Sequence, residues 1–182
     1  MVNDGSVAAG PLKVSGNYSQ APGATLQVGQ ANFNAALAVT GHAALSGALQ
    51  VYVFLPPAPG TRSTAVTFGS LSGSFTSHTI GFRLDTTSTQ IDTVATPQIA
   101  VTPATAAPGD RVTVNGGDFE YESSVSVYLD STTGPPVQTA VTDRGGFFQT
   151  QLVLPAGTSV GPHTLIAVGA GGRKATAILH VS

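Results

Sequence analysis

The run Arg111-Val112-Thr113-Val114-Asn115-Gly116-Gly117 alternates apolar and polar residues and ends in a pair of glycines. Alternation with a period of two predicts a β-strand with one buried face, and here that face carries Val112 and Val114. The Asn-Gly-Gly sequence predicts the turn that ends the strand. This stretch therefore predicts one strand of a sheet that covers a core on one side.

Six further runs of this kind lie between residues 97 and 182, separated by turns rich in Gly, Pro and Asp. They are Gln98–Thr102, Ser124–Leu129, Val137–Thr142, Phe147–Leu154, His163–Val168 and Ala175–Val181. Seven short strands in about 85 residues are typical of an Ig-like β-sandwich. Because the chain has no Cys and no Trp, its core is expected to be aliphatic, with Phe119 and either Phe147 or Phe148.

Three motifs in this half lie at turns and core positions. The first is Pro108-Gly109 followed by Val112-Thr113-Val114-Asn115-Gly116-Gly117-Asp118-Phe119; the others are Thr142-Asp143-Arg144-Gly145-Gly146-Phe147 and Gly161-Pro162-His163-Thr164-Leu165. Together they resemble bacterial Ig-like modules of the IPT/TIG kind over nearly all of 97–182. The resemblance implies a spacer, an adhesion unit or an accessory domain of an extracellular enzyme.

The first half contains two internal repeats. Lys13-Val14-Ser15-Gly16 is repeated as Ala38-Val39-Thr40-Gly41, and Leu26-Gln27-Val28 as Leu49-Gln50-Val51. A repeat of about 25 residues made of short strands and Gly turns predicts the coils of a parallel β-helix. A small independent β-sandwich is the alternative fold for this half.

Residues 12–94 also resemble the terminal rungs of autotransporter-type parallel β-helices. The similar runs are 16–28 (from Gly16-Asn17-Tyr18), 41–51 (from Gly41-His42-Ala43) and 66–75 (from Val66-Thr67-Phe68). The sequence thus predicts an all-β chain with a β-helix-end domain at 1–95 and an Ig-like sandwich at 97–182. The boundary is expected at residues 95–97, after a polar strand at 86–94; the best helical window, 31–37, is short.

Composition limits the classes of function. Only 9% of the residues are charged and the formal net charge is -2, which argues against nucleic-acid binding because a phosphate backbone requires clustered Lys and Arg. No uncharged apolar run approaches the roughly 18 residues of a membrane span. The polar, charge-poor surface favours a piece of a longer exported protein, extracellular or on a bacterial cell surface, although residues 1–5 do not begin a signal peptide.

Two groups of residues are candidates for binding. Exposed aromatic rings bind sugars, which makes Tyr18, Tyr52, Tyr121 and Tyr128 candidate glycan contacts. Asp118, Glu120 and Glu122 are the densest acidic cluster and are candidate Ca²⁺ ligands, with a solvated loop as the alternative. In an extended chain Phe119 and Tyr121 would lie on the face opposite these acids.

No catalytic motif is found, and the chain is expected not to be an enzyme. Asp85 and Asp92 are the carboxylates that a glycosidase would need, but an ion pair between Arg83 and Asp85 on one strand face is the simpler interpretation. No cofactor is expected apart from Ca²⁺. A triad of Ser, His and Asp would have to be assembled by the fold.

These observations predict a non-catalytic structural or adhesive module of a bacterial extracellular protein. A carbohydrate-binding accessory module, with a glycan or cell-wall polymer as partner, is one alternative. A self-assembling fibre subunit that associates through its strand edges is the other.

Overall fold

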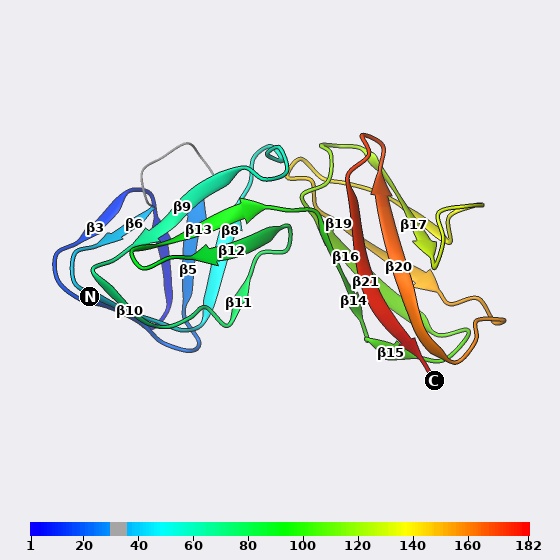
Figure 1. Ribbon diagram of the computed structural model, residues 1–182, viewed down its shortest axis with the longest axis horizontal. Coiled ribbons are helices and arrows are strands. Elements are labelled where there is room, and N and C mark those ends of the chain that lie inside the picture. Colours follow the sequence, from blue (N-terminus) through cyan, green and yellow to red (C-terminus); the bar gives the residue numbers. More distant parts are fainter. Residues whose placement is uncertain (30–35) are drawn as a thin grey trace. The chain divides into compact units, whose positions relative to one another are not determined.

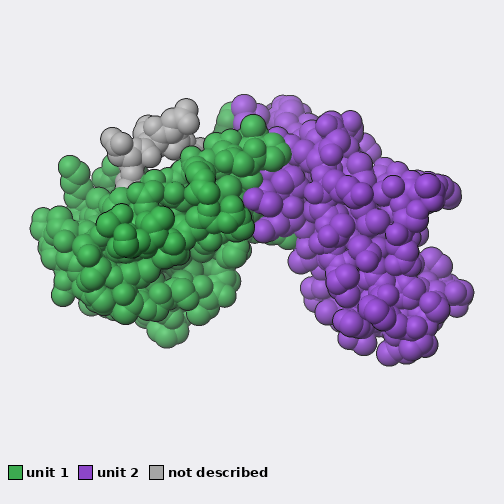
Figure 2. Space-filling model, viewed as in Figure 1, with its two compact units in different colours: residues 1–54, 58–95 green, residues 55–57, 96–182 purple. Residues whose placement is uncertain are grey.

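In the computed structural model, the described residues, 1–29 and 36–182, form strands and turns without a helix (Figure 1). The chain divides into two compact units (Figure 2). Unit 1 contains residues 1–54 and 58–95, and unit 2 contains residues 55–57 and 96–182. No helix in the described part is long and apolar enough to cross a membrane. Most of the helical window at 31–37 lies outside the described residues.

The described residues of unit 1 form three sheets. The first has β1 (Val2–Asn3), β4 (Tyr18–Gln20), β7 (His42–Leu45) and β10 (Ser70–Gly73), and the second has β2 (Ser6–Ala9), β5 (Thr25–Gly29), β8 (Ala48–Tyr52) and β11 (Ser77–His78). The third has β3 (Leu12–Val14), β6 (Leu37–Val39), β9 (Arg62–Thr67), β13 (Gln90–Ala95) and β12 (Phe82–Thr86). The chain visits the three sheets in the same order four times, the fourth time with β10, β11 and β12, and we call each such circuit of three strands a coil.

Neighbouring strands of successive coils run parallel and in register. Lys13 pairs with Ala38 and Val14 with Val39, while Leu26, Gln27 and Val28 pair with Leu49, Gln50 and Val51. These are the residues of the two sequence repeats. The repeat exists because equivalent positions in successive coils face the same surroundings.

Inward-facing apolar side chains form columns through the coils. Leu26 and Leu49 are in register and are 0% and 1% exposed, and Leu37 and Val66 are both 0% exposed. Alternation places every second residue of these strands inside. Burial of these columns is the main source of stability in unit 1.

The third sheet ends in an antiparallel arrangement. β13 pairs antiparallel with both β9 and β12. The prediction of one polar strand at 86–94 is therefore wrong: Thr86 ends β12 and Gln90 begins β13. Between them the Thr87 hydroxyl accepts a hydrogen bond from the Gln90 amide (3.1 Å), and such a Thr-stabilised turn favours a hairpin over a continuous strand.

Unit 2 contains two sheets. One has β14 (Gln98–Thr102), β16 (Arg111–Gly117) and β19 (Phe148–Val153), and the other has β15 (Thr105–Ala106), β21 (Lys174–Val181), β20 (Gly161–Gly169), β17 (Ser124–Leu129) and β18 (Gln138–Val141). All seven predicted strands are present. The additional strand, β15, has only two residues and gave no periodic signal.

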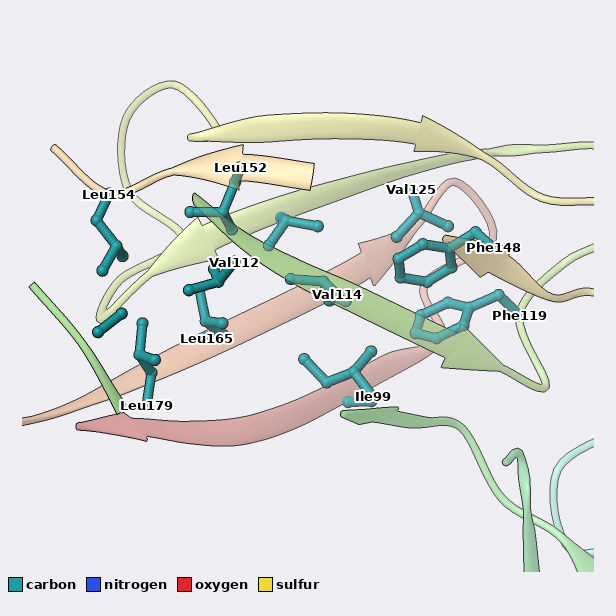
Figure 3. Close-up of a cluster of buried hydrophobic side chains, with 14 of the residues drawn as sticks. Ile99, Val112, Val114, Phe119, Val125, Phe148, Leu152, Leu154, Leu165 and Leu179 are labelled. Carbon is teal, nitrogen blue, oxygen red and sulfur yellow. The ribbon is translucent and has the colours of Figure 1, made fainter. Parts of the chain in front are cut away.

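The core of unit 2 combines aliphatic side chains with two aromatic rings (Figure 3). Val112, Val114 and Leu179 are at most 1% exposed. The rings of Phe119 and Phe148 meet edge to face with centroids 5.3 Å apart, a geometry that aromatic pairs prefer. Of the two aromatic candidates left open by the sequence, Phe148 is the core residue.

Two glycines test how closely the coils of unit 1 pack. Gly47 and Gly60 both have positive φ, but a Cβ on Gly47 would overlap the carbonyl oxygen of Ala24, whereas Gly60 has open space. Gly60→Ala should cost about 1–2 kcal/mol through backbone strain alone. Gly47→Ala should cost about 1–3 kcal/mol more through overpacking. Urea unfolding, followed by amide exchange in β5 and β8, measures the loss of unfolding free energy in each variant. Equal losses in the two variants would contradict close packing of the coils at Gly47.

Candidate functional site

The four candidate tyrosines lie in different surroundings. Tyr18 on β4 is only 1% exposed, and its hydroxyl accepts from Asn3 Nδ2 (3.2 Å) and donates to Gln20 Oε1 (3.0 Å). Burial raises the pKa of its hydroxyl above the ordinary value. The prediction of Tyr18 as a glycan contact is therefore wrong, because its ring fills the interior of unit 1.

Gln20 continues this buried polar chain. Its Nε2 lies within hydrogen-bonding distance of three carbonyl oxygens, those of Ser46 (2.7 Å), Ala48 (3.1 Å) and Ala24 (3.3 Å). Two of these carbonyls belong to the next coil. The Gln20 side chain therefore supplies a hydrogen-bond donor to backbone carbonyls at a corner between strands. Buried polar groups need such partners, because a buried polar group without a hydrogen bond destabilises the fold.

The other tyrosines remain accessible to different degrees. Tyr52, at the end of β8, is 54% exposed and Tyr121 is 44% exposed, while Tyr128 on β17 is half-buried. Interaction with Glu122 raises the pKa of Tyr121. Tyr52 belongs to unit 1, and Tyr121 and Tyr128 belong to unit 2.

The three acidic residues are divided between two arginines. Asp118 and Glu120 lie at Arg173, with N–O distances of 2.8 and 3.9 Å, whereas Glu122 pairs with Arg144 at 3.2 Å. Asp118 and Glu122 both have positive φ, so this segment is not an extended strand. The expected separation of aromatic and acidic faces is wrong, because Asp118 and Phe119 are both buried.

Arg173 stabilises a buried cluster that we call the Arg173 cluster, consisting of Asp118, Glu120, Arg173 and the carbonyl of Pro57. One guanidinium nitrogen, Nη1, donates to Asp118 Oδ1 (2.8 Å) and to the Asp118 carbonyl (2.9 Å), while Nη2 donates to the Pro57 carbonyl (2.8 Å). The contact anchors residues 55–57 in unit 2. Sequence reasoning missed it because Arg173 and Asp118 are 55 positions apart.

The charges of the Arg173 cluster do not balance. Two carboxylates face one guanidinium, and Asp118 Oδ2 and Glu120 Oε2 are buried without a hydrogen-bond partner. Burial raises the pKa of Asp118 to about 6, against the lowering effect of Arg173. The cluster therefore favours proton uptake at mildly acidic pH.

Glycines on the β20–β21 turn make room for Glu120. A Cβ on Gly169 or Gly171 would overlap the Glu120 carboxylate. Among the described residues, no group of three acidic, His or Cys side chains could hold a metal ion. The predicted Ca²⁺ ligands Asp118, Glu120 and Glu122 are thus not brought together as one ligand set.

A Ser, a His and an Asp meet at another place in unit 2. His163 Nδ1 lies 2.7 Å from Asp130 Oδ2, and its Nε2 lies 2.7 Å from the Ser159 carbonyl oxygen and 3.4 Å from the Ser159 hydroxyl. The nearest partner of each ring nitrogen, at 2.7 Å, is an oxygen that accepts, which stabilises the doubly protonated ring. Accordingly, the hydrogen bond to Asp130 raises the pKa of His163, and the same bond lowers that of Asp130.

This arrangement does not fit nucleophilic catalysis. A serine nucleophile needs a neutral imidazole whose free nitrogen accepts the hydroxyl proton. Here the nearer partner of Nε2 is a carbonyl oxygen, so the nitrogen holds a proton of its own. The group fixes the segment before β20 to the end of β17.

The paired carboxylates of unit 1 are also neutralised. Asp85 and Asp92 are opposite each other on β12 and β13, and Arg62 forms ion pairs with both. Arg83 pairs with Asp85, which confirms the expected surface ion pair. Asp92 also accepts hydrogen bonds from Thr64 (2.9 Å) and Gln90 (2.8 Å).

The comparisons with known proteins give no family: no family model and no curated protein matches this chain.

Substitution of Arg173 tests the contribution of the Arg173 cluster to stability. Arg173→Met leaves the buried Asp118 and the partly buried Glu120 without a cation and should cost about 3–5 kcal/mol of unfolding free energy. Arg144→Met removes an exposed pair and should cost at most about 1 kcal/mol. Urea denaturation of both variants measures the difference. Similar losses would show that the Arg173 cluster does not stabilise unit 2.

The pair of His163 and Asp130 predicts a pH dependence. The pKa of His163 is raised in the folded chain. The contact of His163 with Asp130 therefore contributes fully to the free energy of unfolding below pH ~6.5. This contribution is lost as the pH rises through the raised pKa. Asp130→Asn removes the main cause and should return the His163 pKa toward its ordinary range. An NMR titration of the ring resonances in both chains measures this, and an unchanged pKa would contradict the assignment.

Proposed function

We propose that this chain is a non-catalytic structural module of a bacterial extracellular or cell-surface protein. In this proposal unit 1 is the end of a parallel β-helix and unit 2 is an Ig-like sandwich. The in-register parallel coils with continuous apolar columns support the first assignment. The two sheets enclosing one apolar core support the second.

The observation that carries the structural role is the pairing of β15 with β21. Thr105 pairs with His180 and Ala106 with Val181, and the strands run parallel. The amides of His180 and Ser182 donate to the carbonyls of Ala104 (2.9 Å) and Ala106 (3.1 Å). The first of these strands lies near the start of unit 2, and the second lies at its end.

This pairing suits a module that transmits tension. Pulling on residues 97 and 182 draws β15 toward its N-terminus and β21 toward its C-terminus. Because the two strands are parallel, the forces slide them past each other and load their hydrogen bonds together rather than one after another. A module that connects parts of a surface protein needs this resistance.

Single-molecule stretching of unit 2 between residues 97 and 182 within the full chain tests the proposal. Ala106→Pro removes an amide that faces β21, and it should lower the unfolding force. The matched control Thr105→Pro removes an amide that faces away from β21 and should leave the force closer to that of the parent chain. Equal forces in all three chains would contradict a load-bearing role.

A second candidate function is glycan binding by unit 1. Tyr52 is 54% exposed and Phe54, two residues later, is 79% exposed. Exposed aromatic rings are the side chains on which sugars stack. Phe54 was not predicted as a glycan contact, because only tyrosines were considered as candidates. The test is retention of the chain on insoluble polysaccharides or cell walls. Retention that is lost in Tyr52→Ala and Phe54→Ala but kept in Tyr121→Ala would favour glycan binding by unit 1. No retention of the parent chain would exclude it.

A further inference from the structure

Asp92 on β13 holds a hydroxyl group and a carboxamide on one of its carboxylate oxygens. Its Oδ1 accepts hydrogen bonds from Thr64 Oγ1 on β9 (2.9 Å) and from Gln90 Nε2 on β13 itself (2.8 Å). The other oxygen, Oδ2, lies 3.6 Å from Arg62 Nη1. The two carboxylate oxygens therefore have separate partners, and Oδ1 lies between an alcohol and an amide.

A β-bulge in β9 brings the Thr64 hydroxyl to this position. β9 and β13 lie side by side (Figure 1), and Ile91 on β13 is opposite Val66 on β9. The next residue, Asp92, is opposite Thr64 rather than Ala65, so Ala65 is the extra residue of the bulge. Bulges change the direction of side chains in a strand. Without this bulge a methyl group, and not a hydroxyl, would face Asp92.

The three side chains are partly closed to water. Asp92 is 7% exposed, and Thr64 and Gln90 are half-buried. Water is the nucleophile that competes with a hydroxyl for the carbon of a carboxamide, and water also hydrolyses an ester once it has formed. Partial burial therefore favours a reaction between the two side chains.

We propose that Thr64 and Gln90 form an intramolecular ester cross-link between β9 and β13, with Asp92 as the base and proton carrier. Thr64 Oγ1 gives its proton to Asp92 Oδ1 and bonds to Gln90 Cδ. The tetrahedral intermediate collapses by breaking the Cδ–Nε2 bond, while Asp92 passes the proton to Nε2 and ammonia leaves. The Asp92 carboxylate is regenerated, and no other reactant is consumed.

Both proton transfers fit the observed distances. A group that moves a proton must lie about 2.6–3.2 Å from the atom concerned, and Asp92 Oδ1 meets this condition for both Oγ1 and Nε2. The fold also holds the reacting groups together, which makes the reaction intramolecular. Gln20 and Gln27 lack this geometry, because their amides donate to carbonyl oxygens rather than to a carboxylate.

The cross-link closes the chain around the last coil. β10, β11 and β12 all lie between residues 64 and 90. An ester at this place restricts the unfolded chain as a disulfide does, in a protein that has no cysteine. This modification of unit 1 does not depend on the proposed structural role, whose test concerns unit 2.

Trypsin digestion tests the proposal on the full chain. Trypsin cuts after every Arg, which places Thr64 and Gln90 in separate peptides, 63–83 and 84–111. After prolonged incubation of the folded chain at neutral pH, its mass should be lower by one ammonia and the two peptides should remain joined. Mild alkali, which hydrolyses esters but not amides, should then separate them.

Variants assign the reacting atoms. Thr64→Val and Asp92→Asn should keep the mass calculated from their sequences and give separate peptides, whereas Thr64→Ser, which keeps a hydroxyl, should still give the joined peptide. Thr67→Val is the matched control, because Thr67 is directly opposite Gln90 on β9, and it should remain cross-linked. Separate peptides and full mass in the parent chain, or a joined peptide that persists in Thr64→Val, would overturn the proposal.

Discussion

A parallel strand depends for its backbone hydrogen bonds on strands that lie a whole coil away in sequence, and unit 1 is built on this constraint. Gly41, Ala48 and Gly69 each donate to a carbonyl 24–28 positions earlier, at 2.9 Å. No coil satisfies its own backbone, so the coils stack in register and the inward side chains align as columns.

Unit 2 uses another solution, in which the strands pair antiparallel except for β15 with β21, and two sheets close over one core. Its polar contacts lie at the margins of this core and join segments that the sheets alone would leave loose. Arg173 anchors residues 55–57, and His163 fixes the segment before β20. In a chain with so few charges, most charged groups form ion pairs within the fold.

Sequence reasoning located the strands of unit 2 because Val112, Val114 and their equivalents repeat with a period of two. It also found the coil register, because Lys13 and Leu26 recur as Ala38 and Leu49 at the positions that pair. It failed where the partner lies farther away in sequence: the buried Tyr18 hydroxyl accepts a hydrogen bond from Asn3, and Asp118 pairs with Arg173. The local alternation of residue types contains no information about side chains that meet from distant parts of the sequence. For this reason the site residues were predicted less well than the strands.

The central claim is the parallel, in-register stacking of the coils, and a disulfide test addresses it most directly. The chain has no cysteine, and Gln27 and Gln50 are in-register neighbours whose side chains are hydrogen-bonded at 3.2 Å. The Gln27→Cys/Gln50→Cys variant should oxidise to one intrachain disulfide under native conditions, since paired residues lie within the Cα distance a disulfide allows. Gln27→Cys/Tyr52→Cys, displaced by two positions, should remain reduced. Preferential crosslinking of this displaced pair would contradict the stacking of β5 on β8.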